Sequence, residues 1–287
     1  MNKTIYMTYY KNIPPMVSKN WLKLNKTYKI DFSLDKQCIE FLESNFNKNI
    51  SDIFKIIKKG MYKADLWRLC KLYINSGVYA DVDLAPYLRI DQLDKDIEFY
   101  SCLSVNEGSI FQAFMVNFSK PKNPLILIFL LSFLINKPIV QHDGPTFDMY
   151  KCLHYMISDK KIKSGKRYNL NEVKIQISIG NSKENCKDIN LYYFPTDINY
   201  TIRLCDNPYS DVFDFDIKNN ILSIKRTDSN TGWSYGHFID ICFPHKTSIL
   251  LFTERAPDSQ NPVHFVTHNN KKILDSRYIQ YVENGGW

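Results

Sequence analysis

Residues 64–83 read ADLWRLCKLYINSGVYADVD and carry most of the information about the fold. The apolar residues of the first half recur at the spacing of one face of an α-helix, which predicts an amphipathic helix that ends at Ser76-Gly77. Val78–Ala80 then form a short apolar strand, and Leu84–Pro86 turn the chain. A helix followed at once by a buried strand is typical of a unit of an α/β domain.

Two carboxylates follow this strand directly, in Asp81-Val82-Asp83. Ligands of open α/β sheets bind at the carboxyl ends of strands, which is where this pair is expected to lie. Carboxylate oxygens suit Mg²⁺ or Mn²⁺, and such an ion can bridge a diphosphate and neutralise the charge of a leaving nucleotide. The bare pattern has little specificity, because it recurs as Asp214-Phe215-Asp216, where we expect a turn.

A second pair of charged residues lies on the predicted helix. Asp65 and Arg68 are three positions apart and therefore share one face. One interpretation is a local ion pair near the start of the helix. The other is a sugar-binding pair, because carboxylates and guanidinium groups form strong charged hydrogen bonds with hydroxyls. The spacing alone leaves both open.

The string from Ala64 to Asp83 resembles the (S/A)D-x-x-R … LY … GG-x-Y-x-D-x-D signature of the DXD-containing glycosyltransferases. This family includes fungal initiating mannosyltransferases and capsular polysaccharide transferases, and is related to the large clostridial glucosylating toxins. The one departure is Ser76, where the family has Gly. The resemblance implies a GT-A fold, in which helices flank a nucleotide-binding α/β sheet. It also implies a metal-dependent, retaining transfer of a hexose from a UDP- or GDP-sugar to an acceptor hydroxyl.

The signature assigns roles position by position. Asp65 and Arg68 are expected to hold the donor sugar, and Tyr79 and Asp81 to contact sugar, ribose or phosphate. Asp83 is expected to be the direct ligand of Mn²⁺ (or Mg²⁺), with Asp81 beside it. In this interpretation positioning and electrostatics, rather than a protein nucleophile, lower the barrier.

Weaker resemblances add donor-site candidates on both sides. Ile5–Tyr9 resembles the family's opening strand, which places Thr8 and Tyr9 at the donor, with Tyr9 stacking on the base; a core role for Tyr9 stays open. Gln112 matches an Asn that contacts the sugar region. Asp143 lies in a stretch that resembles the Gly-Pro turn near the acceptor.

The family also supplies a further metal or phosphate ligand near the C-terminus. Trp233 faintly resembles a Trp that touches the donor phosphate, although a packing role is the simpler interpretation. His264 and His268 alternate with apolar residues in a strand-like run and would face one side. We take His268 as the candidate metal ligand because it ends that run and precedes two asparagines.

The 287 residues suffice for one large α/β domain. Short alternating runs after Val173 predict a β-rich last third. We divide the chain into a GT-A-like domain over 1–205 and a β-rich portion over 206–287, which either completes the same domain or forms a small β appendage. The longest apolar run, Leu125–Ile135, is too short to span a bilayer and predicts a buried helix.

The amino-acid composition indicates in which cellular compartment the protein lies and what its surface can bind. The formal net charge is +7, but the basic residues are dispersed, which is typical of an ordinary solvated surface. Seven widely spaced cysteines and an N-terminus without an apolar signal core favour a reducing compartment. We therefore expect a cytoplasmic protein, of its own organism or of a host, without a transmembrane segment.

Three other functions compete with the transferase. A nucleotide-sugar hydrolase would use the same site without a committed acceptor. A non-catalytic carbohydrate-binding protein would use Asp65 and Arg68 without metal. Nucleic-acid binding is suggested only by the charge, and no basic-aromatic motif supports it. The expected partners are a nucleotide-sugar donor and an acceptor that is a glycan, a lipid-linked sugar or a protein.

Overall fold

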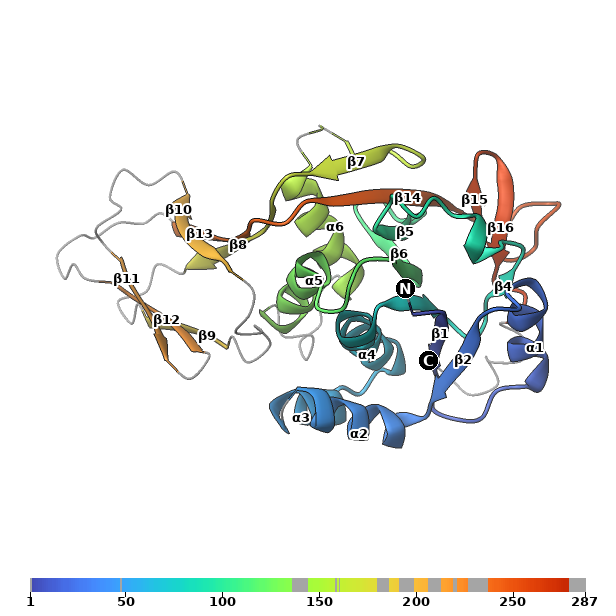
Figure 1. Cartoon of the computed structure of the whole chain (residues 1–287), viewed down its shortest axis with the longest axis horizontal. Helices are drawn as coiled ribbons and strands as arrows, with labels where there is room; N and C mark the ends of the chain where they lie inside the picture. Colours follow the sequence, from blue (N-terminus) through green and yellow to red (C-terminus); the bar gives the residue numbers. More distant parts are fainter. Residues whose placement is uncertain are drawn as a thin grey trace.

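A large sheet forms the centre of the computed structural model, with helices against both faces (Figure 1). The structure describes residues 2–46, 48–135, 144–157, 159, 161–179, 186–190, 199–205, 213–218, 221–226 and 237–278. Within this part of the chain, ten strands make up the large sheet.

The N-terminal elements build the parallel part of this sheet. They are, in chain order, β1 (Thr4–Thr8), α1 (Pro15–Leu24), β2 (Lys29–Ser33), α2 (Asp35–Asn45), α3 (Lys48–Ile56), α4 (Gly60–Asn75) and β3 (Gly77–Ala80). Strand β1 lies between β2 and β3 and is parallel to both. The three carboxyl ends therefore meet at one edge of the sheet, the edge where α/β proteins bind ligands.

The remaining elements of the large sheet come from two separate parts of the sequence. The middle of the chain supplies β4 (Ala85–Pro86), the 3₁₀ turn η1 (Ile90–Gln92), β5 (Phe99–Leu103), β6 (Ile110–Asn117), α5 (Pro124–Ile135), α6 (Gly144–Met156) and β7 (Arg167–Leu170). The C-terminal part supplies β14 (Thr247–Arg255), β15 (Phe265–His268) and β16 (Lys271–Asp275). The strand order is β2-β1-β3-β6-β5-β14-β15-β16-β4, and β7 pairs with β14 beside that path. Strand β16 pairs with β4, so the C-terminal part supports the segment that follows Asp83.

Two apolar cores hold the helices to the sheet. Successive residues of a strand point to opposite faces. Tyr6 and Tyr79 accordingly join the core under helices α2–α6, whereas their neighbours Ile5 and Val78 pack on the other face with Trp21 of α1. The apolar helix α5 is buried along almost its whole length in the first core, which confirms the prediction of a buried helix.

A tight connection joins α4 to β3. Helix α4 ends at Asn75, and Ser76 and Gly77 both have positive φ angles, of 53° and 109°. A Cβ atom on Gly77 would come within 3.0 Å of the carbonyl oxygen of Thr4, so glycine lets β3 enter the sheet beside β1. The helix–strand unit predicted from the sequence is confirmed.

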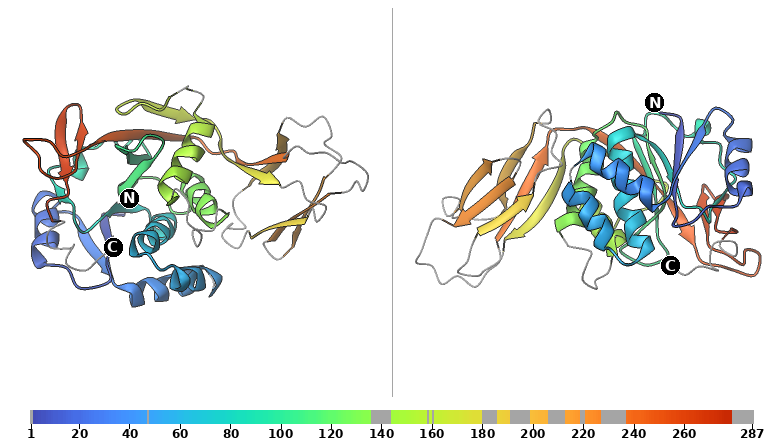
Figure 2. Two further views of the ribbon diagram at one scale, coloured as in Figure 1. Left: turned by 180° about the vertical axis from the view of Figure 1, so that it is seen from behind. Right: turned by 90° about the horizontal axis from the view of Figure 1, so that it is seen from below.

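Two small sheets extend away from the large one beyond α5 and α6 (Figures 1 and 2). The nearer consists of β8 (Val173–Ile179), β10 (Thr201–Cys205) and β13 (His237–Phe243). Four of its isoleucines share the core of α5 and α6: Ile175, Ile177, Ile239 and Ile241. The farther consists of β9 (Cys186–Asn190), β11 (Phe213–Lys218) and β12 (Ile221–Arg226). Asp214 and Asp216 lie inside β11, so the prediction of a turn there was wrong.

The predicted fold class is confirmed, because the chain is α/β with a large helix-flanked sheet and a β-rich last third. The division of the chain at residue 205 stays a prediction. The thiols of Cys38, Cys70, Cys102, Cys152 and Cys242 are buried and free. In the described ranges no helix has the length and apolarity needed to cross a membrane.

Candidate functional site

The chain leaves the sheet at the start of the Asp81-Val82-Asp83 motif. Strand β3 ends at Ala80, and the amide of Asp81 still donates to the carbonyl of Ala113 on β6 at 2.8 Å. A turn follows at once, since the Leu84 amide donates to the Asp81 carbonyl at 3.2 Å. Both aspartates therefore lie in a turn at the carboxyl edge of the parallel strands, as expected from the sequence.

Arg68 links helix α4 to this turn. Its Nη2 atom lies 3.2 Å from Asp65 Oδ1 and 3.5 Å from Asp81 Oδ1. The guanidinium carbon lies 4.5 Å from the centre of the Tyr79 ring, and the Tyr79 hydroxyl donates to Asp81 Oδ1 at 2.5 Å. Asp65 is only 5% exposed and Arg68 only 4%. The structure therefore brings together four residues that the sequence singled out, in one buried cluster.

The pKa values show how strongly these groups interact. Burial raises the pKa of Asp65 from 3.8 to about 6, which Arg68 only partly opposes. Burial acts to lower the pKa of Arg68, but Asp81, Tyr79, Asp65 and Asp83 together raise it above its usual value. Burial also raises the pKa of Tyr79 well above its usual value, so its hydroxyl stays a donor. All three carboxylates thus act on one guanidinium.

Segments distant in the sequence hold the turn in place, and no local pattern predicted these contacts. The indole nitrogen of Trp21 donates to the Leu84 carbonyl at 3.1 Å. The amide of Tyr278 donates to the Asp83 carbonyl at 3.0 Å, and Asn20 donates to the Tyr278 hydroxyl. Helix α1 and the end of the chain therefore fix the turn from two sides.

Thr8 ends β1 and Tyr9 follows it, at the same edge of the sheet. The Thr8 hydroxyl donates to the Ser33 carbonyl at 2.9 Å and lies 3.2 Å from the Cys38 thiol, so it ties β1 to β2 and α2. The Tyr9 ring packs 4.5 Å from the ring of Tyr10, centre to centre. Burial raises the pKa of Tyr9 to about 12, and the charge of Asp83 adds to this shift. Tyr9 is therefore within electrostatic reach of the turn.

Gln112 lies on β6, next to the residue that accepts the Asp81 amide. It is 2% exposed. Both polar atoms of its side chain are buried without a hydrogen-bond partner in the described part of the chain. Buried amides are almost always bonded, so this open amide beside the turn is a candidate contact for a polar ligand.

The donor set suits a hard divalent cation. Three carboxylates face one guanidinium, so the cluster has an excess of negative charge, and Mg²⁺ is commonly held by one or two carboxylates together with substrate phosphates. The described residues contain no group of three His, Cys, Asp or Glu side chains able to hold a metal ion by themselves. His268 packs edge-on against Phe252, with ring centres 5.0 Å apart, and its role as a metal ligand stays a prediction. Asp143 and Trp233 lie outside the described residues.

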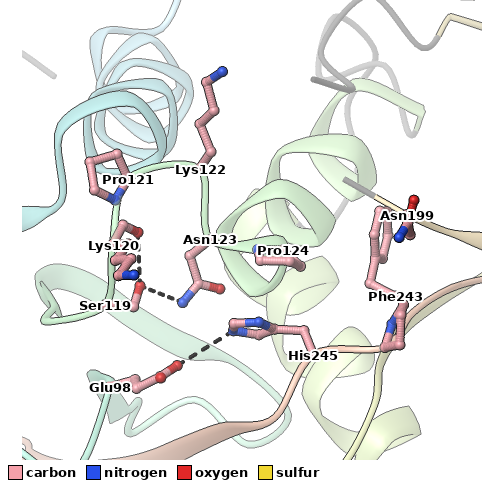
Figure 3. A pocket seen from close by; sticks show the side chains of 11 residues that line it. Glu98, Ser119, Lys120, Pro121, Lys122, Asn123, Pro124, Asn199, Phe243 and His245 are labelled. Carbon is pink, nitrogen blue, oxygen red and sulfur yellow. Dashed lines mark hydrogen bonds and ion pairs between the residues drawn. The ribbon is translucent and has the colours of Figure 1, made fainter. Parts of the chain in front are cut away.

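A separate cavity of about 440 Å³ lies at the opposite edge of the sheet (Figure 3). Its lining includes Glu98, just before β5, and Asn123, just before α5. His245 Nε2 lies 3.5 Å from Glu98 Oε2 across it. Because these residues precede their elements whereas Asp81 follows its strand, this cavity is not part of the aspartate cluster.

A known protein family matches the part of the sequence that forms this site. Residues 16–100 match the family described as the glycosyltransferase sugar-binding region containing DXD motif. The match spans the helix–strand unit with Asp65, Arg68, Asp81 and Asp83. The resemblance drawn from the sequence is thus confirmed over residues 16–100.

Two proteins similar to parts of this chain are named as glycosyltransferases. The chain is 29% identical over 76 residues to an initiation-specific alpha-1,6-mannosyltransferase of Candida albicans (strain SC5314 / ATCC MYA-2876). That match covers 26% of this chain and 20% of the mannosyltransferase, so the chain spans about a fifth of the length of that curated relative. The solved structure of the PaToxG glycosyltransferase is similar over 52% of this chain and 69% of its own, with 18% identity and a TM-score of 0.38.

Proposed function

We propose that this chain is a metal-dependent glycosyltransferase that moves a hexose from a nucleotide sugar to an acceptor hydroxyl. The observation that carries the proposal is the buried ion pair of Arg68 with Asp65 and Asp81, at the carboxyl edge of the parallel strands and inside the matched region. Such a cluster is costly to bury for stability alone, since replacing buried ion pairs with apolar residues is often neutral or stabilising. A ligand-binding role accounts for it.

In this proposal each residue of the cluster has a task. Asp65 and Arg68 bind the hydroxyls of the donor sugar, because each offers charged hydrogen bonds in a buried setting. Tyr79 holds Asp81 in place by its hydroxyl bond and contacts sugar, ribose or phosphate. Gln112 offers its open amide to the sugar region. The ring of Tyr9 lies against the base, within reach of Asp83.

Asp83 and Asp81 would hold Mn²⁺ or Mg²⁺, which when bound would neutralise the charge of the departing diphosphate. The bond between the anomeric carbon and the phosphate oxygen breaks, and the acceptor oxygen forms the new bond to that carbon. The proton of the acceptor hydroxyl passes to the departing phosphate. The GT-A architecture and the retaining course rest on the family resemblance, as do the roles of Asp143, Trp233 and His268.

A screen of nucleotide sugars tests the proposal without knowledge of the acceptor. The full chain is incubated with UDP- and GDP-hexoses and N-acetylhexosamines, with Mn²⁺ or with a chelator, and the released nucleotide is measured. We expect metal-dependent release from one donor, with water as the slow acceptor. Absence of release from all donors, together with absence of nucleotide binding, would contradict the proposal and favour a non-catalytic carbohydrate-binding protein.

Product analysis separates the transferase from a nucleotide-sugar hydrolase. Candidate acceptors are a glycan, a lipid-linked sugar and a protein. Release that one of them accelerates, with the hexose recovered on that acceptor, supports transfer. Release that none of them changes supports hydrolysis. A reducing compartment and a cytoplasmic location, proposed from the cysteines and the sequence, would limit the acceptors to those exposed in the cytosol.

A further inference from the structure

The turn between α3 and α4 lies at the same edge of the molecule as the aspartate cluster. Helix α3 ends at Ile56 and α4 begins at Gly60. Helix α4 leads through a tight connection into β3 and so runs back along it. The start of α4 is therefore on the side where Asp81 and Asp83 follow β3.

This segment, residues 55–63, is here named the basic tip. Its sequence is KIIKKGMYK, with four lysines and no acidic residue. Lys55 and Lys63 are neutralised by Glu43 at 2.8 Å and by Asp35 at 2.7 Å. Lys58 and Lys59 are exposed and have no ion pair in the described part of the chain. The basic tip therefore presents two uncompensated positive charges.

Large apolar side chains are exposed among these lysines. Ile56 is 53% exposed and Met61 is 44% exposed, on the two sides of the connection. Their neighbours Phe54 and Ile57 are buried in the core under the helices, which fixes the basic tip to the rest of the molecule. Exposed aliphatic side chains bracketed by lysines are typical of proteins that lie on a membrane surface, where the apolar groups enter the boundary between headgroups and acyl chains.

We propose that the basic tip docks on an anionic lipid surface. Lys58 and Lys59 contact lipid phosphates and carboxylates, and Ile56 and Met61 insert at the acyl boundary. Charge complementarity favours this occupant, because a neutral protein partner would satisfy the apolar pair but not the two lysines. Docking would turn the edge with the aspartate cluster toward the membrane, where acceptors attached to lipids or membrane proteins lie. The binding itself does not depend on the proposed enzymatic activity.

Vesicle sedimentation of the full chain tests this proposal without donor or metal, so its outcome is separate from that of the enzymatic tests. We expect the protein to sediment with vesicles of phosphatidylcholine plus phosphatidylserine, and much less with phosphatidylcholine alone. The double variant Lys58→Ala/Lys59→Ala should bind about 25-fold more weakly, since each lysine near such a surface contributes about a fivefold change. The double variant Ile56→Ser/Met61→Ser should bind about tenfold more weakly.

Matched controls remove the same chemical groups elsewhere. Lys19→Ala/Lys23→Ala, on α1, makes the same change of charge, and Val105→Ser/Phe238→Ser removes two side chains that are 43% and 42% exposed. Both should bind the vesicles like the unaltered chain. Absence of sedimentation, or sedimentation that the two basic-tip variants and the controls change equally, would overturn the proposal. So would equally tight binding to soluble polyglutamate, which would indicate an acidic protein partner instead.

Discussion

Besides Asp94-Lys95-Asp96, the chain contains the pattern Asp-x-Asp in Asp81-Val82-Asp83 and in Asp214-Phe215-Asp216, and these two copies lie in different structures. The first follows β3 in a turn, where Arg68 and Tyr79 contact Asp81. The second lies inside β11, in regular antiparallel register with β12. In this register the backbone of Asp214 lies opposite Lys225, and that of Asp216 lies opposite Ser223.

The difference shows that the surroundings of the pattern, rather than the pattern, define the candidate site. At the first copy the strand ends, the backbone is held by helix α1 and the C-terminal segment, and a buried guanidinium lies nearby. At the second copy the chain stays in a ladder of strand hydrogen bonds within a small three-stranded sheet. The following predictions test whether function belongs to the first of these two copies and to the residues around it.

The largest effect is expected at Asp83. The variant Asp83→Asn should reduce Mn²⁺-dependent release of nucleotide by about a thousandfold or more, because one charged oxygen ligand of the cation is lost. The fold should stay intact, as judged by circular dichroism. Steady-state kinetics with the donor found in the screen provide the measurement.

The second copy of the pattern supplies the control for this variant. Asp214→Asn/Asp216→Asn removes two carboxylates in the same sequence pattern and should leave turnover within about twofold of the unaltered chain, since changes away from a site are usually near neutral. If Asp83→Asn retained full turnover, or if the control lost as much, the assignment of the metal site would be wrong.

Arg68→Ala should have the second largest effect. Removal of the guanidinium leaves Asp65 buried beside Asp81, so the free energy of unfolding should fall by about 3 kcal/mol. Donor turnover should fall by about a hundredfold, while the dissociation constant of the nucleoside diphosphate changes little, because Arg68 is proposed to bind the sugar. Turnover and calorimetric binding of the nucleoside diphosphate are compared at a temperature where the variant is folded. Equal loss of both would indicate that Arg68 is only structural.

The pKa of Asp65 gives a prediction about stability and pH. Its folded-state pKa, about 6, lies above its ordinary value of 3.8, so the folded protein binds the proton more tightly than the unfolded chain. Between these two values, stability due to Asp65 is lost as the pH rises, by about 3 kcal/mol in total. The difference in unfolding free energy between the unaltered chain and Asp65→Asn, from urea titrations, should change by this amount across that pH range. A difference independent of pH would contradict it.

Local patterns predicted the helix–strand unit, because the apolar spacing of α4, the Ser76-Gly77 stop and the apolar β3 are adjacent in the sequence. The turn after β3 was predicted for the same reason. The turn predicted at Asp214 was wrong, although the local pattern favours a strand. Phe213, Phe215 and Ile217 alternate with polar residues, which is the period of a strand.

Contacts between distant segments could not be predicted. Trp21 bonds to Leu84, and Tyr278 to Asp83, across 63 positions in the first case and many more in the second. A single sequence gives no local signal for such pairs. The open amide of Gln112 could not be predicted either, since only the packed structure shows which polar atoms lack partners.

The smallest effects are expected from substitutions of two side-chain amides on β6, Gln112 and Asn117. Gln112→Met should leave stability unchanged or slightly higher, since both polar atoms lack partners, but should raise the KM for the donor sugar by about tenfold. Asn117→Leu should do the opposite. The Asn117 amide donates to the Leu72 carbonyl at 3.1 Å, so its loss should cost about 1–3 kcal/mol of stability with little change in KM.

Kinetics and urea titrations on the two variants provide this comparison. If Gln112→Met destabilised the protein as much as Asn117→Leu and left KM unchanged, Gln112 would be a structural residue whose partner lies outside the described part of the chain.

Electron paramagnetic resonance of Mn²⁺ tests the central claim most directly, because it reports the bound ion without any turnover. With a nucleoside diphosphate present, the unaltered chain and Asp214→Asn/Asp216→Asn should both remove the signal of free Mn²⁺ in proportion to the protein added. Asp83→Asn should leave that signal in place. Binding of Mn²⁺ by Asp83→Asn as tightly as by the unaltered chain, or its loss in the Asp214→Asn/Asp216→Asn variant, would contradict the account.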